Sequence, residues 1–172
     1  MGQQSFNRNP RAPRPTAVNQ EFGPGKKGII VCKICSAAYY KKSWHHNLEQ
    51  FRGSEKKDTG LVFKTCPACM MIANHQYEGR LMIYNIPVKH SEELGSVIKK
   101  FCEYAFDMDP MDRLIAIVRK SPAEWIITTT ENQMANKLAH KIKKTFRNVA
   151  TRAKFGKDPN DTVEIAVEFS QV

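Results

Sequence analysis

Two pairs of cysteines stand out in this chain because their spacing suits metal binding. Two residues separate the cysteines of each pair, which are Cys32 with Cys35 and Cys66 with Cys69. A Cys-x2-Cys turn can direct two thiolates and nearby backbone N–H groups at one ion, and a closed tetrahedral zinc site needs four such ligands. The segment between the pairs is long enough to bring the second turn back onto the first. The sequence therefore predicts one structural zinc ion, Zn2+, held by all four cysteines.

Other uses of this region remain open. One Cys-x2-Cys pair could carry out redox chemistry, although two pairs suit a metal better. One of His45, His46 and His75 could replace a cysteine ligand. The cysteines could also be reduced thiols in an unrelated fold. A catalytic zinc is not expected, because it needs an open coordination position and four thiolates fill the shell.

A run of aromatic and basic residues follows the first cysteine pair, from Tyr39 to His46. Unpaired bases stack on aromatic rings while lysines and histidines meet phosphates, so this run is a candidate RNA surface. The alternative is that Tyr39 and Trp44 pack the small core around the metal, and at least one of them is expected to do so. The candidate nucleic-acid-binding residues here are Tyr40, Lys41, Lys42, Trp44 and His45.

The second half of the chain reads as an α/β unit. Apolar stretches predict strands at 81–86, 114–118, 125–129, about 150–155 and 163–169, with helices starting at Ser91 and Thr130. The order β-α-β-β-α-β is that of a ferredoxin-like unit, and the extra strand would form a terminal hairpin. Strands 114–118 and 125–129 are expected to be antiparallel neighbours because a short connection joins them.

The helix that starts at Thr130 has two distinct faces. Thr130 is predicted to cap it, with Gln133 completing a capping box. Met134, Leu138, Ile142 and Phe146 form the stripe that should be buried. The opposite face is basic, with Glu131 as the nearby acid, and it is either a solvated surface or a second RNA surface. The candidate RNA-binding residues on that face are Lys137, Lys141, Lys144 and Arg147.

The 172 residues divide into three parts, of α+β class overall. Residues 1–28 are predicted to be a disordered basic tail, which either folds onto phosphates or has no role. Residues 29–79 are the zinc-binding module, laid out like a zinc ribbon or treble clef and too short to bury much core without a metal. Residues 80–172 are the ferredoxin-like domain.

Composition bears on partners and location. The formal net charge is +10, from 27 basic and 17 acidic side chains, which favours a polyanionic partner such as RNA or the ribosome. A soluble basic protein with no such partner is the plain alternative. No apolar run reaches the roughly 18 to 20 residues of a membrane span, and no secretory signal is visible. Five cysteines, four of them in metal-type spacing, fit a reducing compartment, so the expected location is the cytoplasm.

These motifs together resemble a largely uncharacterised family of small bacterial zinc-ribbon proteins. The matching pieces are Cys32–Cys35, Tyr39–Trp44, Cys66–Cys69 and Ile127–Thr130, and the resemblance covers about residues 30–169. Over its cysteine region, that family is similar to the N-terminal zinc domain of the adaptor that exports the large ribosomal subunit in eukaryotes. The adaptor has more cysteine pairs, so its partner-binding residues are not carried over. The resemblance implies zinc, and ribosomal RNA or ribosomal proteins as partners.

Ser36 is a departure from the usual pattern, because glycine is common after the first pair and accepts a positive φ more easily.

The leading functional hypothesis is a non-enzymatic, zinc-stabilised RNA-binding protein associated with the ribosome or translation. The competing hypothesis is a protein–protein adaptor whose zinc ribbon docks a partner. A third is an enzyme acting on nucleic acid, in which Asp107, Asp109 and Asp112 would hold Mg2+, although these acids look more like a turn that ends a helix. No phosphate-binding loop, HExxH motif or Ser-His-Asp set is present to support an enzyme.

Overall fold

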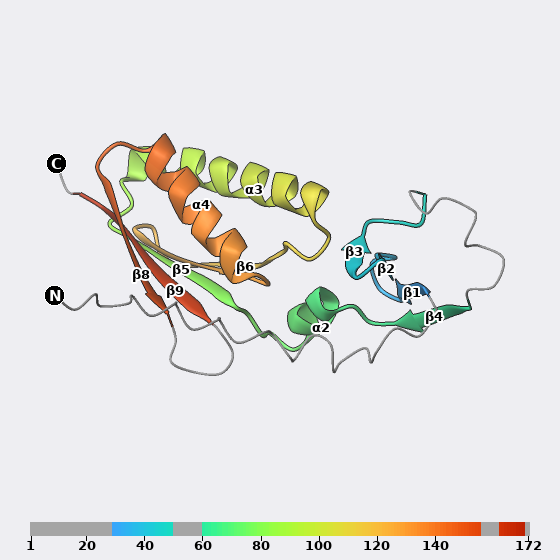
Figure 1. The fold of residues 1–172 in the computed structure, drawn as a ribbon. Helices are drawn as coiled ribbons and strands as arrows, with labels where there is room; N and C mark the ends of the chain where they lie inside the picture. The colour runs from blue at the N-terminus through green and yellow to red at the C-terminus, as the bar shows by residue number, and fades with distance from the viewer. Residues whose placement is uncertain (1–28, 50–59, 156–161, 171–172) are drawn as a thin grey trace, which may run out of the picture.

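The computed structural model describes residues 29–49, 60–155 and 162–170, which form two β-sheets, each with its own core (Figure 1). The fold is of mixed α+β class, with the four paired cysteines in the N-terminal sheet region. The predicted tail at 1–28 and most of the polar loop at 52–60 lie outside the described residues. Within the described part of the chain, no helix is both long enough and apolar enough to cross a membrane.

The first sheet has four short strands in the order β3-β2-β1-β4. Its strands are β1 (Ile29–Cys32), β2 (Ala38–Tyr40), β3 (Ser43–His45) and β4 (Leu61–Lys64). The pairs β1–β2 and β2–β3 are antiparallel, whereas β4 runs parallel to β1. Helix α2 (Pro67–Ala73) follows β4, and Pro67 suits the first turn because its fixed φ is already helical and it has no N–H to satisfy there.

The second sheet has five strands, and two long helices cover one of its faces (Figure 1). The strands are β5 (Gly79–Tyr84), β6 (Leu114–Ser121), β7 (Glu124–Thr129), β8 (Val149–Phe155) and β9 (Val163–Phe169). The helices are α3 (Ser91–Met108), preceded by the 3-10 turn η1 (Val88–His90), and α4 (Asn132–Thr145). Alternate strand residues such as Leu81, Ile127 and Val167 are buried beneath the helices.

The sheet order β6-β7-β5-β9-β8 differs from the ferredoxin-like expectation, which is not confirmed. In that fold the strand after the second helix pairs with the first strand, but here β9 lies between β5 and β8. It runs parallel to β5 and antiparallel to β8, so the predicted terminal hairpin is present but its second strand is central. The difference in burial between β9 and β8 explains this strand order. β9 buries Val163 and Val167, whereas β8 exposes Arg152 and Lys154, which suit an edge.

Two predictions about local pairing and helix faces are confirmed. Strands β6 and β7 are antiparallel neighbours. On α4 and directly after it, the predicted stripe is buried, and the basic residues of the opposite face are exposed. The buried residues are Met134, Leu138, Ile142 and Phe146, and the exposed ones are Lys137, Lys141, Lys144 and Arg147.

The prediction that Thr130 caps α4 is wrong. The helix starts later, and Glu131 occupies the cap position without a side-chain hydrogen bond. Thr130 is buried instead, and its hydroxyl accepts a 2.8 Å hydrogen bond from the Arg113 N–H and donates to the Met111 carbonyl. The extended backbone of β7 carries Thr130 toward the connection between α3 and β6, so its hydroxyl satisfies that backbone rather than the helix.

Candidate metal centre

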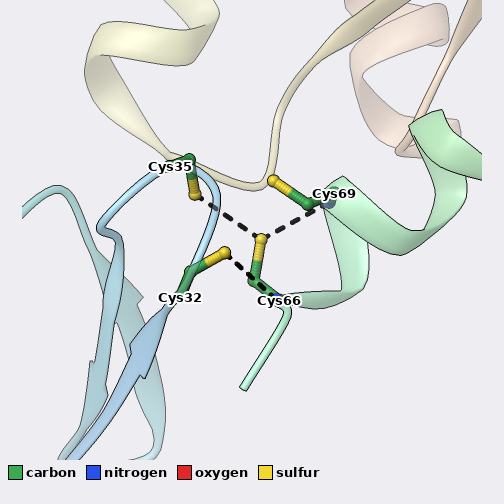
Figure 2. Close-up of side chains that lie close together, drawn as sticks. All are labelled: Cys32, Cys35, Cys66 and Cys69. Atoms are coloured by element: carbon green, nitrogen blue, oxygen red, sulfur yellow. Dashed lines mark hydrogen bonds between the residues drawn. The ribbon is translucent and has the colours of Figure 1, made fainter. Parts of the chain in front are cut away.

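The four paired cysteines converge from two elements that are distant in sequence. Cys32 ends β1 and Cys35 lies in the turn after it, while Cys66 directly precedes α2 and Cys69 lies in its first turn. Figure 2 shows the four sulfurs gathered together, and all lie within 4.8 Å of one another. The Cys35 and Cys66 sulfurs are 3.7 Å apart. Zinc–thiolate bonds of about 2.3 Å in a tetrahedron would place sulfurs about 3.8 Å apart. The four sulfurs can therefore hold one metal ion.

Backbone N–H groups surround the sulfurs. The N–H of Ile34 and that of Cys66 donate to the Cys32 sulfur at 3.4 and 3.3 Å, and the Cys69 N–H donates to the Cys66 sulfur at 3.4 Å. Such donors favour the thiolate form, which is the form that binds metal. Ser36 has a φ of 62°, so the turn does use the left-handed conformation for which glycine is better suited.

The protonation of the thiols shows why a cation suits this site. Burial raises the pKa of Cys32, but the backbone N–H groups of Cys35, Cys66 and Ile34 lower it more, to about 6. Burial raises the pKa of Cys66 well above the usual range, and it raises that of Cys69 to about 11. Near neutral pH the protein alone does not ionise all of these groups. A bound divalent cation would supply the positive charge that four thiolates require.

Three of the four cysteines are buried, and Cys35 is partly exposed. Cys32, Cys66 and Cys69 are 2%, 0% and 4% exposed. Ala37 and Ala68 pack beside them, and Trp44 and Met111 cover the cluster as partly buried neighbours. A metal held here would have four sulfur ligands, which is the arrangement of a structural site.

The connection between α3 and β6 also reaches the cysteines, which sequence reasoning missed. An Nη1 atom of Arg113 lies 4.0 Å from the Cys69 sulfur. Arg113 also stacks over Phe106 at 4.7 Å and donates from Nε to the Pro110 carbonyl at 2.9 Å. The guanidinium would offset part of the negative charge of four thiolates around a divalent ion. No local pattern could reveal this contact, because it joins two sheets through residues far apart in the chain.

The predicted histidine and acidic alternatives do not gather into a site. Within residues 29–49, 60–155 and 162–170, the four cysteines are the only group of three or more His, Cys, Asp or Glu residues placed to hold a metal ion. Asp109 accepts a 2.8 Å hydrogen bond from the Met111 N–H, as expected for a residue that shapes a turn. Asp107 and Asp112 do not join it as a metal-binding group.

Lys41 and Lys42 form the turn between β2 and β3. Both are exposed, and their φ angles are 50° and 66°. A two-residue hairpin turn with both residues at positive φ usually contains Asn-Gly, because L side chains with a Cβ fit this conformation poorly. The hairpin therefore presents two adjacent lysines on a strained turn.

The aromatic residues of the predicted RNA surface are less available than expected. Tyr40 is 7% exposed and packs with Ile29 and Ala38, while its ring stacks on His45 at 3.9 Å. Tyr40 is thus a core residue with little ring surface available to a base, and its role in RNA binding stays a prediction. His45 is half-buried. Trp44 is half-buried against the cysteine cluster, which confirms that it packs the small core.

The predicted basic face of α4 lies on the other unit, so the structure does not bring the two candidate surfaces together. Its last residue, Arg147, lines a hollow of about 770 Å3. Lys89, His90 and Asn85 line the same hollow. Sequence reasoning missed Lys89 and His90 because they lie in η1, where no periodic pattern points to a shared surface.

The chain matches no protein-family model, no curated protein and no solved structure. What the geometry supports is a four-cysteine site of zinc-ribbon type.

Proposed function

We propose that this chain is a non-enzymatic RNA-binding protein that one structural zinc ion stabilises and that acts on or near the ribosome. The observation that carries the proposal is the exposed Lys41-Lys42 turn, which hangs from the sheet that the cysteines hold together.

Zinc is the metal best suited to the site. Four thiolates without an oxygen ligand select a soft or borderline metal such as zinc over Mg2+ or Ca2+. The ion would join the turn after β1 to the start of α2, and this link would supply folding energy to a sheet with a very small core.

The strained turn is the argument for an anionic ligand. A non-glycine residue in the left-handed conformation costs about 1 kcal/mol or more, and Lys41 and Lys42 occupy it in succession. Strain of this kind gathers at functional sites, where it holds a side chain in place. Two adjacent cations at the tip of a hairpin are suited to consecutive phosphates of an RNA strand.

The basic face of α4 would add a second contact. Lys137, Lys141 and Lys144 are exposed there, and Arg147 continues the face into the hollow that Lys89 and His90 also line. The net charge of +10 favours a large polyanion. The cysteine region's likeness to a ribosomal-subunit export adaptor suggests that this polyanion is ribosomal.

The direct test is salt-dependent binding to a labelled single-stranded RNA, followed by fluorescence anisotropy. A Lys41→Ala, Lys42→Ala variant should bind RNA more weakly. The slope of the logarithm of the binding constant against the logarithm of salt concentration is negative, and each lost phosphate contact should reduce its magnitude by about 0.7. The control is Lys99→Ala, Lys100→Ala, which removes the same charge from exposed positions on α3.

Equal losses in both variants would show only a general charge effect, and unchanged binding in both would remove the hairpin from the site. RNA recovered with the tagged protein from cells should be enriched in ribosomal RNA. If no RNA binds at any salt concentration, the protein–protein adaptor becomes the better hypothesis.

A further inference from the structure

Strand β4 is an exposed apolar edge. It is the last strand of the four-stranded sheet, and among the residues that the structure describes it pairs only with β1 (Figure 1). Leu61, Val62 and Phe63 are 52%, 44% and 56% exposed. Proteins usually protect such edges with charged residues, proline or a bulge, because an open apolar edge recruits another strand. None of these devices occurs among the three apolar residues of β4.

The backbone of β4 is oriented to accept a further strand. The Lys64 carbonyl accepts a 3.1 Å hydrogen bond from the Lys33 N–H, so the backbone N–H and C=O groups of Lys64 point toward β1. In a parallel ladder every second residue turns both its N–H and its C=O toward the same neighbour, so Val62 also faces β1. Leu61 and Phe63 therefore direct their N–H and C=O groups to the open side, where an added strand would bond.

The charge around β4 indicates what kind of strand would fit. The described residues of the module, 29–49 and 60–79, contain four lysines, Lys33, Lys41, Lys42 and Lys64, and two acids, Glu49 and Glu78. Lys64 ends β4, and Lys33 follows the β1 residue that pairs with it. A second copy of the chain would bring like charges to this edge. An acidic segment would instead be attracted to it.

We propose that β4 binds an extended, acidic segment of a partner protein as a fifth strand of this sheet. Backbone hydrogen bonds to Leu61 and Phe63 would hold the segment. Its alternate apolar side chains would cover the exposed side chains of β4, and its acids would meet Lys33 and Lys64. This is a protein contact separate from the RNA surface on the β2–β3 turn and α4.

The test uses the full, metal-loaded chain and a random eight-residue peptide library displayed on phage. Selected peptides should alternate apolar and acidic residues. On binding a synthetic copy of one such peptide, the amides of Leu61 and Phe63 should change from fast to slow hydrogen exchange. The amides of Val62 and Lys64 should be protected already in the free protein.

Two variants at one position separate the backbone from the side chain. Phe63→Pro removes the outward N–H without removing a bond to β1, and it should weaken peptide binding at least tenfold. Phe63→Ala keeps the N–H and loses only the ring, so its loss should be smaller.

Three outcomes would overturn the proposal. The library could yield no enriched peptide, or the selected peptide could protect amides elsewhere and leave Leu61 and Phe63 unchanged. Sedimentation could also show a concentration-dependent dimer that Phe63→Pro abolishes, in which case the edge serves a second copy of the chain. If Phe63→Pro fails to fold, hydrogen exchange of the Leu61 and Phe63 amides in the unmodified protein still shows whether the peptide binds at β4.

Discussion

In the proposed function, Lys41 and Lys42 would have opposite effects on the stability of the sheet and on RNA binding. Their left-handed backbone is unfavourable for lysine, and their exposed charges are suited to phosphates. The small size of the surrounding core makes this strain a large fraction of the local stability. The two residues can therefore reveal whether the turn is kept for binding rather than for folding.

Replacing the turn by Lys41→Asn, Lys42→Gly should stabilise the four-stranded sheet by about 1 kcal/mol, because these residues accept the left-handed conformation. The same change should weaken RNA binding because two cations are lost. Thermal unfolding and RNA anisotropy on one preparation measure both effects. A variant that is no more stable than the parent would show that the turn is not strained.

Thr130 provides a second test at single-residue resolution. Its hydroxyl is buried and bonds the Arg113 N–H and the Met111 carbonyl. Thr130→Ala should lower the free energy of unfolding by about 1 to 3 kcal/mol, because it leaves these buried backbone groups unpaired. Thr130→Ser keeps the hydroxyl and should lose less, as denaturant titration can show. Equal losses in both variants would assign the effect to the methyl group instead.

At the scale of elements, α4 shows how one helix can serve a core and a surface at once. Its buried stripe packs on β5, β8 and β9, and its outer face carries the cations. The Phe146 ring, just beyond the helix, contacts Phe169 edge-to-face with the centroids 5.5 Å apart. Stability and RNA binding should therefore respond to different substitutions in this region.

Phe146→Ala should lower the free energy of unfolding by about 3 to 5 kcal/mol, because a buried ring leaves a cavity. Lys144→Ala, on the exposed face, should change it by less than about 0.5 kcal/mol. Urea titrations of the two variants provide the comparison. A large loss from Lys144→Ala would contradict the assignment of the faces.

What could be predicted from the sequence was local. The faces of α4 and the pairing of β6 with β7 follow from periodicity and a short connection, and the cysteine cluster follows from spacing. The position of β9 could not be read in this way, because strand order depends on which edges are buried. The same holds for Arg113, which reaches Cys69 across two units, and for Tyr40, whose burial depends on β1.

At the scale of the whole molecule, the two sheets have separate cores that meet at the connection between α3 and β6. Met111 packs against the cysteine cluster, and Arg113 contacts Cys69. Cores of this kind can unfold separately, although a shared connection couples their edges. Metal binding would therefore determine the stability of the first sheet and affect the stability of only the nearest part of the second.

Cys66→Ser should unfold the sheet containing β1 to β4 while the core of β5, β7 and β9 stays folded. Amide exchange should show loss of protection across β1 and β2 and a smaller loss near Arg113. Protection lost equally throughout both sheets would show that the chain folds as a single cooperative unit.

We expect the four cysteines to hold one zinc ion. Elemental analysis of protein purified without chelator tests it most directly, with Cys66→Ser as the comparison and Cys102→Ser as the control, since Cys102 lies buried on α3 in the other core. One zinc per chain is expected in the unmodified protein and in Cys102→Ser, and substantially less in Cys66→Ser. Absence of stoichiometric zinc from the unmodified protein, or full zinc content in Cys66→Ser, would contradict it.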